Sequence, residues 1–191
     1  MDSASTQALA EVENIADGGS IMLSTDAESY LDVVMSVLDR YCAAKKMPCV
    51  YLAASIPAST LDEAMRSMEI DMSGVRFIDC ISYSLSYKRQ EHVQMVESPT
   101  MLEGMLLKME YLYRLFGKKG GVVIVDSVNA LALHNEVRMM SEFAHLIVAS
   151  GKARGLRVIF LGVEEQTRPE YMDVMAMVCD KVVSVKGAKN I

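Results

Sequence analysis

The chain alternates between short, wholly apolar runs and longer stretches in which apolar residues recur every three or four positions. The runs follow glycine, proline or polar turns and are rich in β-branched residues, as is typical of strands buried on both faces. They lie at 18–24, 49–55, 75–79, 122–127, 156–163 and 181–185. Because amphipathic segments separate them, the pattern predicts an α/β fold: a doubly wound, mostly parallel sheet with helices on both faces.

The apolar spacing also predicts where the helices lie. A first helix presents Leu31, Val34, Met35, Leu38, Tyr41 and Cys42 on one face. Thr60, followed by Glu63, resembles a capping box that opens a second helix. Pro99 is expected at the start of a third helix, because proline is tolerated at the first helical position. Further helices are expected from about residue 137 and after Pro169, whereas the polar stretch 82–96 reads as a long loop.

The length predicts a single domain over residues 1–191, because 191 residues with 51% hydrophobic content suffice for one buried core. No internal repeat or linker interrupts the pattern. Residues 1–17 are expected to form an N-terminal helix or a tail, since Leu9, Val12 and Ile15 give only a thin apolar stripe.

Charge and hydropathy narrow the class of partner. The formal net charge of −6 disfavours nucleic-acid binding, which depends largely on positive charge. No apolar run approaches the roughly 18–20 residues that a membrane span requires, and the polar, acidic start does not resemble a signal peptide. We therefore expect a cytoplasmic protein without a membrane partner.

The cysteines and histidines do not show the spacing of a metal or redox site. Four cysteines lie far apart along the chain without a C-x-x-C pair, and three histidines form no H-x-x-x-H spacing. Each cysteine stands in or beside an apolar stretch, where a free thiol packs as a small hydrophobic group. We expect all four to belong to the core.

The candidate chemistry lies after the strands, because ligands of such sheets bind outside the carboxyl ends of the strands. Asp126 ends the run Val122–Val125 and could hold Mg²⁺ beside a phosphate, as strand-end carboxylates do in nucleotide hydrolases. The alternative is that Asp126 simply caps the following turn. Ser24 and Thr25, after the first strand, could offer hydroxyls to phosphates, or Thr25 and Asp26 could cap the next helix.

The order of several segments resembles the RecA-like ATPases of the KaiC type. PCVYLAASIPASTLDEAMRSMEIDMSGVRFID is similar to the stretch after their phosphate loop, GGVVIVDSVNAL to their Walker B strand, and GKARGLRVIFLGVEEQ and MVCDKVVSV to the strands that follow. HVQMVESPTMLEGMLLKMEYLYRL resembles a form of the fold found in archaeal KaiC-like proteins. The resemblance covers about residues 15–185 and implies a RecA-like fold, with ATP or ADP and Mg²⁺ as the family's ligands.

The departures from that family concern its catalytic elements. An active member carries G-x-x-x-x-G-K-[ST] after the first strand, whereas this chain reads LSTDAESYLDVV, without the lysine or the glycines. Asp26 and Glu28 instead bring negative charge to a helix start that would otherwise attract phosphate. The family's water-orienting glutamates follow the second strand, where this chain has Ala54, Ser55 and Ile56.

These residues favour a non-hydrolysing RecA/KaiC-like domain that acts as a regulatory or scaffolding protein, bound to itself or to related RecA-like subunits. It would have a degenerate Walker A motif, no catalytic residues and no cofactor. The alternative is a nucleotide sensor or weak ATPase that binds ATP or ADP with Mg²⁺ through Asp126, Ser24 and Thr25. A third hypothesis is an unrelated enzyme that uses Glu164 or Glu165.

Overall fold

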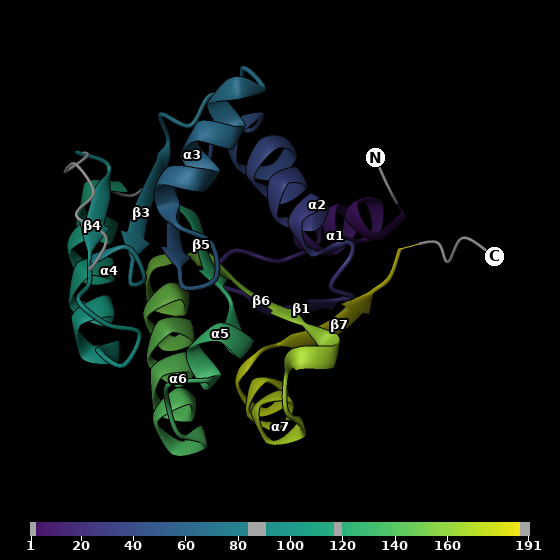
Figure 1. Ribbon diagram of the computed structural model, residues 1–191, viewed down its shortest axis with the longest axis vertical. Helices are drawn as coiled ribbons and strands as arrows, with labels where there is room; N and C mark the ends of the chain where they lie inside the picture. Colours follow the sequence, from purple (N-terminus) through teal and green to yellow (C-terminus); the bar gives the residue numbers. More distant parts are fainter. Residues whose placement is uncertain (1–2, 84–90, 117–119, 188–191) are drawn as a thin grey trace.

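The computed structural model describes residues 3–83, 91–116 and 120–187, which form one seven-stranded sheet in the order β4-β3-β2-β5-β6-β1-β7 (Figure 1). Every strand pair in it is parallel. The strands are β1 Ser20–Thr25, β2 Cys49–Ala53, β3 Val75–Asp79, β4 Val93–Met95, β5 Gly121–Asp126, β6 Leu156–Val163 and β7 Lys181–Val185. The α/β prediction of a doubly wound, parallel sheet is confirmed.

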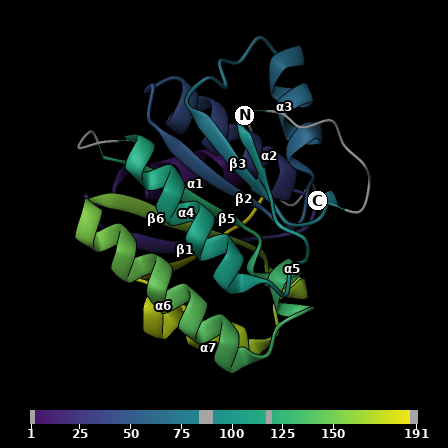
Figure 2. The same cartoon turned by 90° about the vertical axis from the view of Figure 1, so that its left-hand side faces the viewer.

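Helices cover both faces of the sheet (Figures 1 and 2). One layer contains α1 Ser3–Glu13, α2 Tyr30–Ser36, the π-helical η1 Val37–Ala43 and α3 Ala58–Ser67. The other contains α4 Leu102–Phe116, α5 Val128–Ala132, α6 Val137–Arg154 and α7 Pro169–Val178. A 3₁₀ turn, η3 Glu164–Gln166, joins β6 to α7. This arrangement places a separate apolar core on each side of the sheet.

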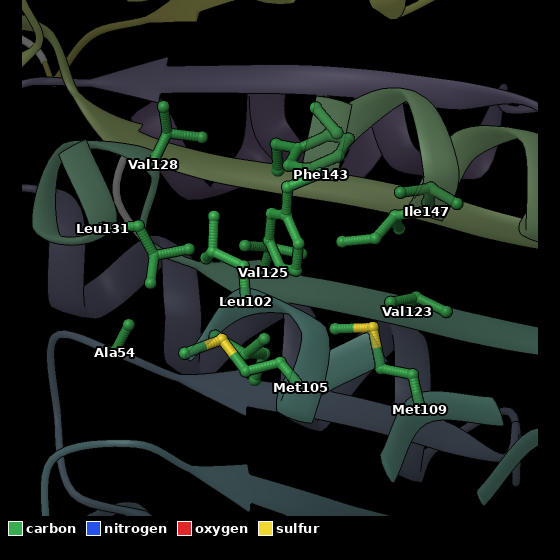
Figure 3. Close-up of a cluster of buried hydrophobic side chains, with 14 of the residues drawn as sticks. Ala54, Leu102, Met105, Met109, Val123, Val125, Val128, Leu131, Phe143 and Ile147 are labelled. Atoms are coloured by element: carbon green, nitrogen blue, oxygen red, sulfur yellow. The ribbon is translucent and has the colours of Figure 1, made fainter. Parts of the chain in front are cut away.

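The residues of β5 before Asp126 are all apolar or glycine, because both faces of this strand are buried. Successive strand residues point to opposite faces, so Val123 and Val125 enter the core beneath α4 and α6, while Val122 and Ile124 enter the core beneath α2 and α3. Figure 3 shows the first of these cores, where Met105 and Met109 of α4 and Phe143 of α6 meet β5. Full burial of one such side chain stabilises the fold by about 1.5–3 kcal/mol.

The predicted helix through Leu31 exists, and Val34, Leu38, Tyr41 and Cys42 of its predicted face are buried, but Leu31 is not. Tyr30, Val33, Val34 and Val37 are buried, whereas Leu31 is 52% exposed. The segment changes from α-helix to π-helix at Val37, and the predicted positions Leu38, Tyr41 and Cys42 in the π-helical part are buried. The predicted core position of Leu31 is wrong, because the first turn of α2 buries Tyr30 and Val33 instead.

One helix start, two further elements and the buried face of α1 also differ from the predicted pattern. The α4 helix begins at Leu102 rather than at Pro99, and the predicted loop contains the short edge strand β4, with residues 84–90 outside the described chain. The short helix α5 was not expected. At the N-terminus, Ala4, Ala8 and Val12 of α1 are the buried hydrophobic residues, so small alanines allow this helix to pack closely against its neighbours.

The α3 helix begins at Ala58, and the predicted capping box at Thr60 is wrong. The Asp79 carboxylate at the end of β3 accepts a hydrogen bond from the Ala58 amide at 2.9 Å. The same carboxylate accepts the Ile81 and Ser82 amides, each at 2.9 Å, and the Ser82 hydroxyl at 2.7 Å. Asp79, which is distant in sequence, therefore accepts the hydrogen bond of a free amide at the start of α3, as a local capping residue would.

Replacing Asp79 with alanine should destabilise the fold by about 2–4 kcal/mol, because the carboxylate is buried and its loss leaves several amides without partners. Urea unfolding measures this difference. Asp71→Ala is the matched control, since Asp71 is exposed and accepts the Ser73 amide at 2.9 Å. An equal loss in both variants would contradict the special role of Asp79.

Candidate functional site

Asp126 ends β5 at the carboxyl edge of the sheet, and its side chain is fully buried. Three hydroxyl groups donate to it: Tyr30 and Ser55 to Oδ1, and Tyr51 to Oδ2. Tyr30 comes from the first turn of α2, Tyr51 from β2, and Ser55 from the segment after β2. We call Asp126 and these three donors the Asp126 cluster.

The topology explains how the Asp126 cluster forms. Because β2 pairs directly with β5, Tyr51 and Ser55 reach Asp126 from the neighbouring strand. Tyr30 follows β1, which is separated from β5 by β6, so its side chain spans the carboxyl end of β6. The Tyr30 side chain thus occupies the edge of the sheet where ligands of such folds bind.

Main-chain hydrogen bonds also connect Asp126 to the end of β2. The carbonyl oxygen of Asp126 accepts the amides of Ala54 and Ser55, at 2.5 and 3.2 Å. Asp126 is therefore held to the end of β2 through both its main chain and its side chain. This position leaves the carboxylate little freedom to turn toward a ligand.

Burial dominates the electrostatics of the Asp126 cluster. It raises the pKa of Asp126 above its ordinary value, although the hydrogen bonds from Ser55, Tyr30 and Tyr51 oppose this shift. Burial also raises the pKa of Tyr30 and Tyr51 well above that of a free phenol, and the nearby Asp126 charge adds to the effect. The two phenols therefore stay protonated and act as donors at neutral pH.

The arrangement does not fit a magnesium nucleotide as it stands. Both Asp126 oxygens already accept hydroxyl donors, and the residue has no exposed surface through which a hydrated cation could reach it. Within the described residues, no group of three or more His, Cys, Asp or Glu side chains could hold a metal ion. Cation binding at Asp126 would require the cluster to open.

Ser24 and Thr25, the other predicted ligand residues, lie in β1 and are buried. Their hydroxyls have no hydrogen-bond partner within the described chain, so Thr25 does not cap the next helix through its side chain. No hydrogen bond joins either residue to Asp126 in that part of the chain, and β6 lies between their strands. A ligand that contacted all three residues would therefore have to span the end of β6.

Asp26 is the residue that caps the turn before α2. Its carboxylate accepts the Ser29 amide at 2.8 Å and the Gly187 amide at 3.0 Å. The hydrogen bond from Gly187 is the main cause that lowers the pKa of Asp26 below its ordinary value. A negatively charged side chain therefore already binds an amide at the helix start, where a phosphate loop would present amides to its ligand.

Glu164 and Glu165 do not form a paired acid. Glu164 accepts the Ser184 hydroxyl at 2.6 Å and lies 3.1 Å from the Lys186 ammonium. The Ser184 hydrogen bond, followed by that from Lys186, lowers the pKa of Glu164. Both glutamates are exposed, so these contacts belong to a solvated edge beside β7.

Comparison with known proteins identifies the fold class. No family model and no curated protein matches the chain. Among solved structures, a KaiC-like protein from the hyperthermophilic archaeon Pyrococcus horikoshii OT3 superposes with a TM-score of 0.65 and 15% sequence identity. The match covers 93% of this chain and 76% of the other. The fold is RecA-like. At this identity the likeness concerns the architecture and not the chemistry.

The sequence of this RecA-like domain did not indicate two members of the Asp126 cluster, Tyr30 and Tyr51. Tyr51 lies within the apolar run 49–55, and Tyr30 comes directly before Leu31, so the local pattern gave neither residue a polar role. The available signal was that a buried tyrosine needs a partner for its hydroxyl. The sequence could not name that partner, because Asp126 is 96 residues from Tyr30 and 75 from Tyr51.

Replacing Asp126 with alanine should destabilise the RecA-like domain by about 2–4 kcal/mol, because it leaves three hydroxyls without their acceptor. Tyr30→Phe and Tyr51→Phe, which each remove one donor, should cost about 1–2 kcal/mol. Urea unfolding of single and double variants provides the measurement. The losses should not add, because the residues share one hydrogen-bond network, and strict additivity would contradict that network.

The cluster also predicts how stability changes at alkaline pH. The folded-state pKa of Tyr30 and Tyr51 is raised, so their stabilising effect is complete below about pH 10 and is lost as the pH rises above it. Each phenol should lower the free energy of unfolding by about 1.4 kcal/mol per pH unit in that range. Urea unfolding at pH 9–11.5 should show a shallower loss in Tyr51→Phe than in the wild type. Tyr83→Phe, which removes an exposed hydroxyl, should match the wild type.

Proposed function

We propose that this RecA-like domain does not hydrolyse nucleotides and acts as a regulatory or scaffolding protein through contacts with other proteins. In this proposal the phosphate loop of the archaeal KaiC-like fold is degenerate, and the protein partners are copies of this chain or related RecA-like subunits. The observation that carries the proposal is the Asp126 cluster, in which the strand-end carboxylate serves as an internal hydrogen-bond acceptor.

The Asp126 cluster supports the proposal because a catalytic magnesium ion needs accessible carboxylate oxygens. Here Tyr30, Tyr51 and Ser55 use both oxygens, and burial favours the neutral form of the acid. Removing the hydroxyls to admit a cation would leave buried phenols without partners, which costs about 1–3 kcal/mol for each. The cluster therefore favours a closed structure over a metal site.

The turn before α2 supports it independently. Catalysis on a triphosphate needs a cation and free amides near the β- and γ-phosphates. This turn supplies neither lysine nor glycine, and Asp26 would repel a phosphate that approached the helix start. Ser55 stands in the segment where the resemblance places a water-orienting glutamate, and its hydroxyl donates to Asp126. No acid or base remains there to activate water.

A nucleotide sensor is the second candidate, and one observation favours it. The hydroxyls of Ser24 and Thr25 are buried at the carboxyl end of β1 without a partner in the described residues. Buried polar groups are normally satisfied, so each of these hydroxyls has capacity to bond a ligand or a water molecule, one on each face of the strand. Binding there would have to proceed beside Asp26 and without the Asp126 carboxylate unless the cluster opens.

Calorimetric titration with ATP and with ADP, each in the presence of Mg²⁺, separates the two candidates. The scaffold proposal expects no binding heat up to about millimolar nucleotide, where affinity is negligible, and no phosphate release in a parallel turnover assay. Asp126→Ala serves as the comparison, with circular dichroism to verify that the variant is folded. Asp126→Asn, which keeps the side-chain volume, replaces it where the alanine variant unfolds.

The contradicting outcomes are distinct. Micromolar binding that disappears in either Asp126 variant would show that the carboxylate contacts the nucleotide complex, and the sensor would replace the scaffold. Binding that survives those variants but weakens in Thr25→Val would place the ligand at β1 instead. Phosphate release that depends on Asp126 would overturn the non-hydrolysing proposal itself.

A further inference from the structure

The outer face of α4 carries an apolar stripe that no described element covers. Leu107, Tyr111 and Leu115 are 72%, 56% and 59% exposed, and their spacing of four residues aligns them along the helix. Met101, just before the helix, is 44% exposed. The core does not require these side chains, because the opposite face of α4 already supplies Met105 and Met109 to it.

Two charged residues accompany the stripe. Glu103 lies in the first turn of α4 and Arg114 in the last, and both are exposed. Within the described residues, neither takes part in an ion pair or a side-chain hydrogen bond. The helix is therefore acidic at one end of its exposed face and basic at the other.

The apolar and charged positions are symmetric about the middle of the helix. Glu103 and Arg114 are equally distant from the midpoint between residues 108 and 109. Leu107 and Tyr111 are symmetric about residue 109, and Met101 and Leu115 about residue 108. One two-fold axis near this midpoint would therefore bring each residue opposite a suitable partner on a second α4 helix, as an isologous interface requires.

We propose that the outer face of α4 binds the same face of a second copy of this chain, with the two α4 helices antiparallel. In this dimer Glu103 of each copy faces Arg114 of the other, while Leu107 and Tyr111 meet at the centre. A parallel arrangement would place like charges opposite one another, which is unfavourable. The charge pattern thus selects both the occupant and its direction.

The α6 helix extends this surface. It lies beside α4 in the same layer (Figure 2), and its Ser150 and Arg154 side chains donate to Glu110 of α4 at 2.6 and 2.5 Å. Met139 and Leu146 of α6 are 45% and 54% exposed. A stable interface takes about 800 Å² from each partner, more than one helix face offers. Rotation about the proposed axis places α6 over α6 of the second copy, so both helices contribute to the contact.

The inference rests on the proposed function in that it names a protein partner, but it does not depend on the Asp126 cluster. The α4 face and the carboxyl edge of the sheet are built from different residues. Monomeric protein that binds no nucleotide would overturn this dimer and leave another scaffold partner to be found. Dimeric protein that hydrolyses ATP would overturn the proposed function and leave the dimer intact.

Sedimentation equilibrium of the full chain at about 5–200 µM tests the surface directly. The wild type should sediment as a dimer in the upper part of this range, and Leu107→Glu should weaken dimerisation at least about 100-fold, because it places two like charges in an apolar centre. Met177→Glu is the matched control: Met177 is 71% exposed on α7 and lies outside the α4–α6 surface. This control should dimerise like the wild type.

Exchange of the two charges tests the antiparallel geometry without disturbing the apolar stripe. Glu103→Arg and Arg114→Glu should each weaken the homodimer about tenfold, because each places like charges opposite one another at both ends of the interface. A mixture of the two variants should recover wild-type affinity by forming a heterodimer, since every facing pair is then of opposite charge. The double variant should recover it as a homodimer.

Three results would overturn the proposal. The first is a wild type that stays monomeric throughout the concentration range. The second is a wild-type dimer that Leu107→Glu leaves unchanged, which would place the interface elsewhere. The third is a mixture of Glu103→Arg with Arg114→Glu that dimerises no better than either variant alone. Should Leu107→Glu fail to fold by circular dichroism, the charge-exchange variants alone decide.

Discussion

The carboxylate of Asp126 connects β5 with the start of α2 and with the end of β2, which are distant from it in the sequence. Its hydroxyl donors come from the first turn of α2, from β2 and from the segment after β2, while its own main chain ends β5. A buried carboxylate is costly unless its oxygens accept hydrogen bonds, so each donor offsets part of the cost of the burial. The network also fixes the position of the start of α2 relative to β2 and β5.

This constraint explains why the Asp126 carboxylate is not accessible at the carboxyl edge of the sheet. In a RecA-like sheet that edge is the natural place for a ligand, since the strand ends and helix starts converge there. In this protein Tyr30 spans the end of β6, and Asp26 accepts amides from the turn before α2 and from Gly187. Asp126 and Asp26 are thus both engaged with donors from this chain. A ligand that used the Asp126 carboxylate would have to compete with this internal network for its oxygens.

The α4 helix has apolar side chains on both its inner and its outer face. On α4, the inner face supplies Met105 and Met109 to the core, and the outer face repeats an apolar pattern at Leu107 and Tyr111. Exposed leucines are common singly, but an aligned series with opposite charges at its two ends is not explained by solubility or by the fold. The polar side chains around Asp126 are thus paired within the chain, whereas the apolar stripe of α4 is exposed.

The sequence by itself determined the architecture. Continuous β-branched runs such as 122–125, separated by amphipathic segments, specify a parallel sheet covered on both faces, because such strands must be buried on both sides. The same local pattern predicted a helix from about residue 137, and α6 begins at Val137. It also identified Asp126 as a strand-end carboxylate. Each of these features depends on residues that are neighbours along the chain.

Only the tertiary structure decided what these residues contact. The Asp79 carboxylate, and not Thr60, caps α3; Leu31 is exposed on the outer face of α2; and Tyr30 and Tyr51 converge on Asp126. Each outcome depends on partners brought together by the order of strands in the sheet. A periodic pattern records which face of an element is apolar, but it carries no information about which distant donor will satisfy a buried acceptor. The role of Asp126 therefore follows from strand order and not from the motif in which it stands.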